Sequence, residues 1–294
     1  MAKTAARYTR CAVRFVHWVR DNGDDAESAH DFDGLLVEYL QYIYEQGFGK
    51  SEGVNALYGI LNRAPWLKEH LPMAKRALKG WTKRQPSVAW PPVTWPVCVA
   101  IGVKMTTNGQ HSAGVACVLA FDCLLRISEL LALRARDIVM AGDPRVGMRF
   151  EGMWLRLAKT KTGPNKSVRV RSAVVRQLVL LLARGKRGAD LLFPYAVGTF
   201  RRHFKRACAD LRVSSDVVVH SLRHGGATHL YTEEKMAVGD IAEHGRWASV
   251  ESARHYLQAC RAVLMAREAE VVVELGRVLA SDLVRSFALA QKHI

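Results

Sequence analysis

A cluster of prolines limits how this chain can fold. Four of the nine prolines fall between residues 86 and 96, in the stretch PSVAWPPVTWP. Proline fixes φ and lacks a backbone N–H, so it interrupts both helices and sheet ladders. We therefore expect a linker over residues 86–95 that joins a domain of residues 1–85 to a domain of residues 96–294.

The first domain is predicted to be a small bundle of four helices. Apolar residues recur at helical spacing near residues 8–20, and further helical segments end at Gly47, before Pro65 and near Arg84. Glycine just after a helix and proline just beyond it are typical of helix ends.

The second domain is predicted to be mainly helical with a small sheet. Helices are expected near residues 96–105 and 112–135, and others follow residue 172. Three segments rich in β-formers, GMRF, MWLRLA and SVRVR, are separated by turn residues and predict a three-stranded antiparallel sheet. The expected fold class is therefore mainly α.

The charge of the chain points to a polyanion. Its net charge is +16 over 294 residues; residues 1–88 carry 13 Lys/Arg against 10 Asp/Glu, and the remainder 30 against 17. Such a balance usually indicates nucleic acid as partner. No apolar run reaches the ~18 residues of a membrane span and no signal peptide is visible, so we expect an intracellular protein. Whether it works in a bacterial cytoplasm or a nucleus is left open.

One stretch near the C-terminus combines residues suited to phosphate chemistry. His220 and Arg223 are three residues apart and share a face if they lie on a helix. Trp247 follows, and Tyr256 comes nine residues later, in a helix that Ser249 is expected to cap. Arginine binds phosphate oxygens, histidine moves protons near neutral pH, and tyrosine can act as a nucleophile.

A further cation lies far upstream. Arg126 interrupts the apolar run VACVLAFDCLL, within the helix expected at 112–135. A buried arginine is costly unless it is paired or faces a site. Glu129 lies one turn away and is the expected partner.

These residues, in this order, resemble the tyrosine recombinase family, which includes the phage-type integrases. The resemblance rests on Arg126-Ile-Ser-Glu129, His220-Ser-Leu-Arg223, Trp247 and Tyr256, together with the basic turn AKTKTGPNKSVRV that places Lys161 at the family's lysine. It covers roughly residues 93–260. Its combination of motifs and spacing is more specific than any one motif.

The resemblance implies site-specific cleavage and rejoining of DNA, with Tyr256 as the nucleophile of a 3′-phosphotyrosyl intermediate. Arg126 and Arg223 would hold the non-bridging phosphate oxygens. Lys161 would be the general acid, with Lys159 as the rival in the same turn. The reaction would need neither metal nor ATP.

The remaining roles follow from the same resemblance. His220 would act as general base or as phosphate ligand, Trp247 would replace the histidine of many members, and Glu129 would orient the cations. The first domain would be a core-binding, SAM-like DNA clamp. Four histidines, at 220, 224, 229 and 244, are an alternative metal site, but no carboxylate or cysteine follows at a familiar zinc spacing, and we expect no cofactor.

The expected partners are double-stranded DNA and further copies of the chain. Family resemblance implies a tetramer on two DNA sites, joined through an exchanged C-terminal helix and serving a mobile element. The apolar residues of that tail recur at helical spacing: Val263, Val271, Leu275, Val278, Leu279, Leu283 and Phe287. Packing on its own domain is the alternative. Two other functions stay open: relaxation of supercoils in the manner of a type IB topoisomerase, and DNA binding without chemistry.

Overall fold

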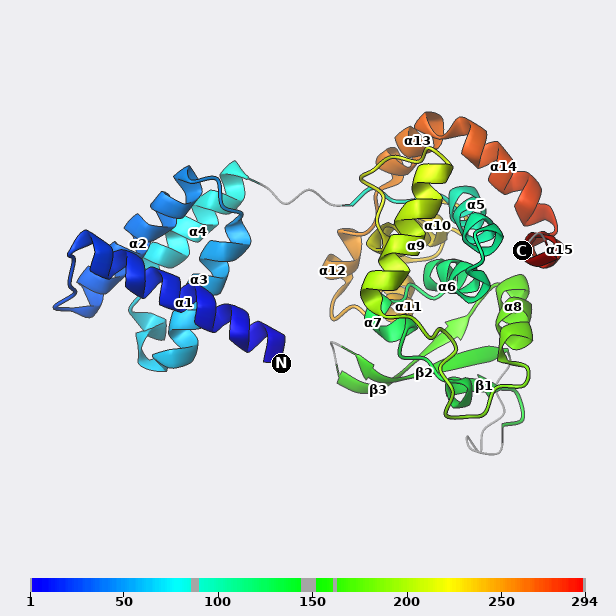
Figure 1. Ribbon diagram of the computed structural model, residues 1–294, viewed down its shortest axis with the longest axis horizontal. Coiled ribbons are helices and arrows are strands. Elements are labelled where there is room, and N and C mark those ends of the chain that lie inside the picture. The colour runs from blue at the N-terminus through cyan, green and yellow to red at the C-terminus, as the bar shows by residue number, and fades with distance from the viewer. Residues whose placement is uncertain (1, 86–89, 144–151, 161–162, 293–294) are drawn as a thin grey trace. The chain divides into compact units, whose positions relative to one another are not determined.

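The chain forms two compact units, Met1–Ala89 and Trp90–Ile294 (Figure 1). The computed structural model describes residues 2–85, 90–143, 152–160 and 163–292. Both units are mainly helical, and one three-stranded antiparallel sheet lies in the second. The predicted fold class is confirmed.

The first unit packs its helices around an aromatic core. Phe15, Tyr39 and Trp81 are buried at its centre. A buried carboxylate, that of Asp33, accepts hydrogen bonds from the backbone N–H groups of Met73 and Ala74, at 2.7 and 2.9 Å, and so caps the last helix. The helices are α1 (Ala2–Asn22), α2 (Ala29–Glu45), α3 (Lys50–Arg63), the 3₁₀ turn η1 (Pro65–Glu69) and α4 (Pro72–Arg84).

The second unit begins with two closely packed helices, α5 (Trp95–Thr107) and α6 (His111–Asp122). A Cβ atom on Gly114 would lie 2.3 Å from the carbonyl oxygen of Gly102, so glycine permits this close approach. Further helices follow in the chain, and several of them pack against this pair (Figure 1). They are α7 (Ile127–Leu130), α8 (Ala173–Ala183), α9 (Val197–Asp210), α10 (Val219–Thr232), α11 (Val238–Gly245), α12 (Val250–Arg254), α13 (Ala259–Glu268), α14 (Glu270–Ser281) and α15 (Leu283–Lys292).

The sheet has the order β1-β2-β3, and its strands are β1 (Ile138–Met140), β2 (Met153–Thr160) and β3 (Gly163–Val170). Leu155 pairs with Val168 and both are buried, so alternate side chains face the core. Two of the three predicted strands correspond to β2 and β3. The strand predicted at GMRF lies outside the described residues. The third strand of the observed sheet is β1, which follows the short turn η2 (Ala135–Asp137) and pairs with the edge of β2 that β3 leaves open.

The single helix predicted over residues 112–135 is wrong. Helix α6 ends at Asp122 because Leu124 adopts a left-handed conformation, with φ of 49°. The chain then turns, and α7 begins after Arg126. Arg126 is therefore the N-cap residue of a new helix rather than a residue in the middle of a long one.

The C-terminal tail packs largely on its own unit. Phe287 of α15 is 1% exposed, and its ring approaches Gly102 and Gly114 of the first helix pair. Helix α14 lies along α5 (Figure 1). Val271 and Val278 of α14 remain exposed, at 84% and 63%. The apolar residues of the tail are thus divided between the core and the surface.

Two adjacent glycines fix where α10 lies, and α10 carries two of the predicted site residues. A Cβ atom on Gly225 would lie 1.9 Å from the carbonyl oxygen of Val93, and one on Gly226 would lie 2.2 Å from that of Phe121. Because backbone atoms cannot yield as side-chain ends do, only glycine allows this approach.

We predict that Gly226→Ala lowers the free energy of unfolding by about 1–3 kcal/mol, because the added methyl group must push α10 away from α6. Gly239→Ala in α11 is the matched control, since its Cβ would meet nothing within 4 Å, and alanine there is expected to be neutral or slightly stabilising. Urea unfolding of both variants measures the difference. Equal stability of the two would contradict this account of the helix contact.

Candidate active site

The break between α6 and α7 exposes two carbonyl groups to buried arginines. The carbonyl oxygen of Cys123 accepts a hydrogen bond from Nη1 of Arg246, at 3.2 Å. That of Leu124 accepts from Nη2 of Arg246, at 3.0 Å, and from Nη1 of Arg223. The carbonyls that the broken helix leaves free are therefore satisfied by side chains from a distant part of the sequence.

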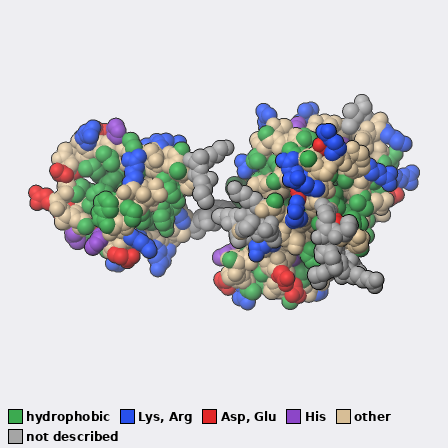
Figure 2. All heavy atoms as spheres, turned by 90° about the horizontal axis from the view of Figure 1, so that it is seen from below, with side chains coloured by type: hydrophobic (Ala, Val, Ile, Leu, Met, Phe, Trp, Pro, Cys, Tyr) green, Lys and Arg blue, Asp and Glu red, His purple; other side chains and the backbone are tan. Residues whose placement is uncertain are grey.

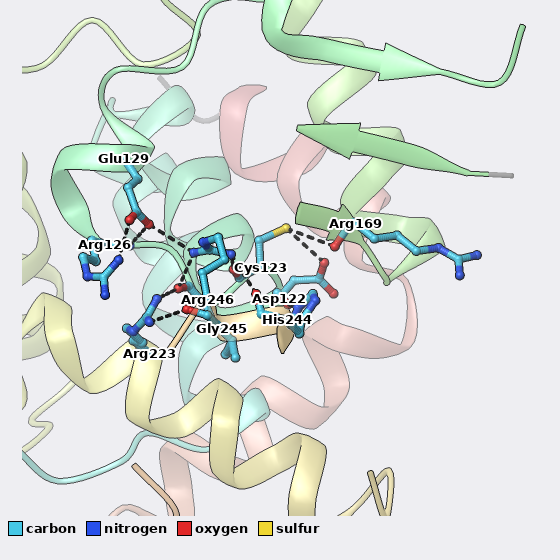
Figure 3. A network of polar contacts seen from close by, with 10 residues as sticks. Asp122, Cys123, Arg126, Glu129, Arg169, Arg223, His244, Gly245 and Arg246 are labelled. Atoms are coloured by element: carbon cyan, nitrogen blue, oxygen red, sulfur yellow. Dashed lines mark hydrogen bonds and ion pairs between the residues drawn. The ribbon is translucent and has the colours of Figure 1, made fainter. Parts of the chain in front are cut away.

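Glu129 is part of the same network, in which it contacts Arg126 and Arg246 (Figure 3). Its carboxylate accepts from the backbone N–H and from Nη1 of Arg126, at 3.0 and 2.7 Å, and from Nη2 of Arg246, at 3.1 Å. Burial, the largest influence, raises the pKa of Glu129, but the Arg126 backbone N–H and the two guanidinium groups outweigh it and hold that pKa below its ordinary value. The carboxylate therefore stays ionised and oriented.

Helix α10 brings His220 and Arg223 to this network. Arg223 is fully buried, and its Nη1 and Nη2 donate to the carbonyl oxygens of Leu124 and Gly245. Burial, with the nearby guanidinium groups of Arg246 and Arg126, lowers the pKa of Arg223. Arg126, by contrast, keeps 22% of its side chain exposed. Of the two predicted phosphate ligands, Arg126 is the accessible one in this conformation.

Tyr256 lies against α10 among aromatic side chains. Its ring stacks on His224, with centroids 4.4 Å apart and planes 25° apart, and lies 4.6 Å from Trp247 and 5.6 Å from His220. The guanidinium of Arg223 lies 4.3 Å from the Trp247 ring and 5.6 Å from that of Tyr256. Four predicted site residues, His220, Arg223, Trp247 and Tyr256, therefore meet at one place.

The local structure around Tyr256 differs in part from the prediction. Ser249 caps α12 by accepting from the backbone N–H of Ser252, at 3.1 Å, as expected. The helix, however, ends at Arg254, and Tyr256 lies in the turn that follows. Its carbonyl oxygen accepts from the hydroxyl of Thr228 at 3.1 Å, which ties this turn to α10.

Two histidines beside Tyr256 are strongly affected by burial. Burial, with the nearby guanidinium groups of Arg223 and Arg126, lowers the pKa of His220 to about 4. Burial, His220 and two arginines lower the pKa of His224 to about 3. Both imidazoles are therefore neutral at pH 7, so His220 is able to accept a proton.

Lys161 lies outside the described residues. Lys159, the rival, lies in β2, where its backbone pairs with Pro164 of β3. Among the described residues no group of three His, Cys, Asp or Glu side chains is arranged to hold a metal ion. No helix in that part of the chain is long and apolar enough to cross a membrane.

Comparison with known proteins places this arrangement in a family. The model of the phage integrase family matches residues 105–262, which is more than half of the chain and contains every predicted site residue. The chain belongs to the phage integrase family. A comparison with curated proteins finds no significant match.

Solved structures of tyrosine recombinases share the integrase fold. The XerH site-specific recombinase bound to palindromic difH substrate is 16% identical, with a TM-score of 0.55 over 81% of this chain and 72% of that one. The lambda integrase dimer bound to a COC′ core site is 15% identical, with a TM-score of 0.57 over 78% and 65%. The Tn1549 transposon integrase with circular intermediate DNA is 13% identical, with a TM-score of 0.55 over 86% and 98%.

Arg246 is the member of this network that sequence reasoning missed. It is 7% exposed and adopts a left-handed conformation at the end of α11. In the sequence it reads as one more basic residue in a basic chain. Its position directly before Trp247 is the only signal that the sequence offers.

The buried imidazole of His244 predicts a loss of stability in acid. Burial chiefly, and then Arg246, lower the pKa of His244 to about 4, although its contact with the carbonyl of Asp122 opposes them. The unfolded chain takes up the proton near the ordinary pKa of about 6.5. The stability is therefore fully present above pH 6.5 and is lost as the pH falls through about 4.

We predict that His244→Gln makes the free energy of unfolding less dependent on pH between 6.5 and 4.5, by at most about 1.4 kcal/mol per pH unit. Met105 is fully buried in the second unit, so the rate at which peroxide oxidises it across a urea series measures the unfolding of that unit alone. His30→Gln, whose side chain is 85% exposed, is the control and should leave the slope unchanged. An unchanged slope in His244→Gln would refute the prediction.

Proposed function

We propose that this integrase cuts and rejoins DNA strands at specific sites through a covalent bond between Tyr256 and a 3′-phosphate. Family membership and a fold shared with DNA-bound recombinases support recombination. The observation that carries the proposal is the meeting of Tyr256, Trp247, His220 and Arg223 in one cluster, which Glu129 and Arg246 connect to Arg126.

The arginines would stabilise the charge that develops on the phosphoryl group. The oxygen of Tyr256 attacks phosphorus, the bond to the 5′-oxygen breaks, and the pentavalent transition state carries extra negative charge on its non-bridging oxygens. Fixed guanidinium groups favour that charge, and removing one such donor typically costs about 10²–10³ in rate. The buried indole N–H of Trp247, which has no partner among the described residues, is a further donor for a phosphate oxygen.

Two proton transfers complete the reaction. The phenol of Tyr256 must lose a proton, and the neutral imidazole of His220, whose ring lies 5.6 Å from that of Tyr256, would either accept it or bind the phosphate. The departing 5′-oxygen must gain a proton, which Lys161, or Lys159 in β2, would donate. Because the phosphotyrosyl bond replaces one phosphodiester by another, religation by the 5′-hydroxyl would need neither ATP nor a metal.

The site would have to open when DNA binds. Arg223 is 0% exposed, its Nη groups already donate to carbonyl oxygens, and the rings of Trp247 and Tyr256 lie over it. A phosphate can reach this guanidinium only if the turn that carries Tyr256 moves. Bringing an anion among three arginines would relieve their mutual repulsion and so favour the open form.

Basic groups of the second unit would bind the DNA backbone. Lysine and arginine side chains gather on one face of this unit (Figure 2). Helix α9 exposes Arg201, Arg202, Lys205 and Arg206 on successive turns, while Phe200 and Phe204 bury its other face. The first unit, with its smaller net charge, would act as the core-binding clamp that the family resemblance implies.

The exposed part of the tail would contact a second copy. Val263, Val271 and Val278 are 62%, 84% and 63% exposed on α13 and α14. The sequence grouped them with Leu283 and Phe287, which instead lie in the core of their own unit. Assembly of four copies on two DNA sites, as proposed for a mobile-element integrase, would use the first group while the second anchors the tail.

We predict that Tyr256→Phe binds DNA but forms no covalent adduct, because phenylalanine keeps the ring contacts and lacks the attacking oxygen. The protein first selects its preferred sequence from a random pool of duplexes. A nicked duplex with that sequence then traps the cleaved state. Denaturing gels then measure the adduct. Tyr231→Phe on α10, where the tyrosine is 45% exposed, is the matched control and should form it. An adduct that persists in Tyr256→Phe would overturn the assignment of the nucleophile.

We also predict that a 5′-bridging phosphorothiolate restores cleavage by Lys161→Ala but not by Arg223→Ala. A thiolate leaves without a general acid because the pKa of a thiol is about 8.5, whereas charge on the non-bridging oxygens still requires arginine. Single-turnover cleavage rates on both substrates provide the measurement. Restoration of Lys159→Ala alone would assign the acid to Lys159, and equal restoration of Lys161→Ala and Arg223→Ala would reject this division of roles.

A further inference from the structure

Arg246 occupies a conformation that arginine rarely adopts. Its φ and ψ are 57° and 40°, in the left-handed region where a side chain larger than that of glycine is strained by about 1–3 kcal/mol. The turn points its guanidinium inward, and only 4% of the side chain is exposed. A strained residue with a buried charge persists only where the surrounding structure holds it in place.

Every Nη hydrogen of Arg246 has an acceptor. Nη1 donates to the carbonyl oxygens of Cys123 and His244, at 3.2 and 2.8 Å. Nη2 donates to the carbonyl oxygen of Leu124, at 3.0 Å, and to the carboxylate of Glu129, at 3.1 Å. With four bonds already made in a buried place, this guanidinium has no Nη donor left for a phosphate.

The acceptors of Arg246 are shared with both of the proposed phosphate ligands. Oε2 of Glu129 accepts from Arg246 and from the backbone of Arg126, and Oε1 accepts from the Arg126 guanidinium (Figure 3). The carbonyl oxygen of Leu124 accepts from Arg246 and from Arg223. A change at Arg246 therefore alters what holds Arg126 and what holds Arg223 at the same time.

We propose that Arg246 is a positioning residue for strand cleavage, which fixes Glu129 and the Leu124 carbonyl so that Arg126 and Arg223 face the non-bridging oxygens of the bound phosphate. The inference rests on the proposed function. It goes further because it assigns a role to a residue whose Nη donors are all used within the protein.

A substrate with a neutral phosphate analogue distinguishes a role of Arg246 in positioning the other arginines from a role in general stability. In a methylphosphonate linkage, a methyl group replaces one charged non-bridging oxygen, so the substrate needs less cationic charge at fixed positions. We predict that Arg246→Gln cleaves the ordinary suicide duplex about 10–100-fold more slowly than the unchanged protein at saturating DNA, as is usual when a group behind a ligand is lost. On the methylphosphonate duplex it is expected to be within about 3-fold of the unchanged protein.

Arg156→Gln is the matched control. Asp137 accepts from the backbone of Arg134 at 3.0 Å and from Arg156 at 3.0 Å, which repeats the contacts of Glu129 with Arg126 and Arg246 away from Tyr256. Its loss should change the two cleavage rates by the same small factor. The double variant Arg126→Gln/Arg246→Gln should be slower than Arg126→Gln alone, but by a smaller factor than Arg246→Gln costs in the unchanged protein, because only the positioning of Arg223 is then left to lose.

The outcomes distinguish this inference from the function on which it rests. If the unchanged protein leaves both duplexes uncut, the proposed function fails. If it cuts them and Arg246→Gln loses the same factor on both, Arg246 only stabilises the fold and the inference is overturned. If circular dichroism shows that Arg246→Gln does not fold, Arg246→Lys replaces it, because lysine keeps the charge and loses the paired donors. Its cleavage rates on the two duplexes are then compared with those of the unchanged protein in the same way.

Discussion

Glu129 lies between two arginines that come from different parts of the chain, and the geometry of the site depends on this contact. The carboxylate is 3% exposed and accepts three hydrogen bonds, from Arg126 and Arg246. Leaving one partner of such a buried pair without the other usually costs about 3–5 kcal/mol. One anion among three guanidinium groups leaves a local excess of positive charge, which a bound phosphate would balance. The same contact therefore connects the start of α7 to the end of α11, and in the proposed function it would prepare the site for an anion.

This arrangement requires a broken helix. Leu124 in the left-handed conformation ends α6 and turns the carbonyls of Cys123 and Leu124 toward Arg223 and Arg246. A continuous helix would use those carbonyls in its own hydrogen bonds, so neither arginine could bond to them. The glycines of α10 then let Arg223 approach the break, and the rings of Trp247 and Tyr256 cover it. Two of the four non-glycine residues with positive φ among the described residues, Leu124 and Arg246, thus lie where we propose that the chemistry takes place.

Local patterns were sufficient to predict the helices of the first unit, the mainly helical class and the hairpin of β2 and β3. They failed where distant contacts decide the local structure. The apolar run through Phe121 and Leu125 predicts an unbroken helix, and its break is stabilised by side chains about a hundred residues further along. Arg246 was missed because neither its left-handed conformation nor its burial is visible in the sequence. The spacing of apolar residues in the tail predicts one apolar face, whereas the fold of the whole unit decides that Phe287 is buried and Val271 exposed.

The most direct test of the account identifies the amino acid that becomes joined to DNA. The trapped complex is digested with nuclease and trypsin, and the peptide that carries a nucleotide is sequenced by mass spectrometry. Cleavage after Arg254 and Arg261 yields a peptide in which Tyr256 is the only tyrosine, and Tyr231 falls in a separate peptide, residues 224–235. The account predicts a nucleotide joined through its 3′-phosphate to the side-chain oxygen of Tyr256. A nucleotide on Tyr231, or on any other residue, would contradict it.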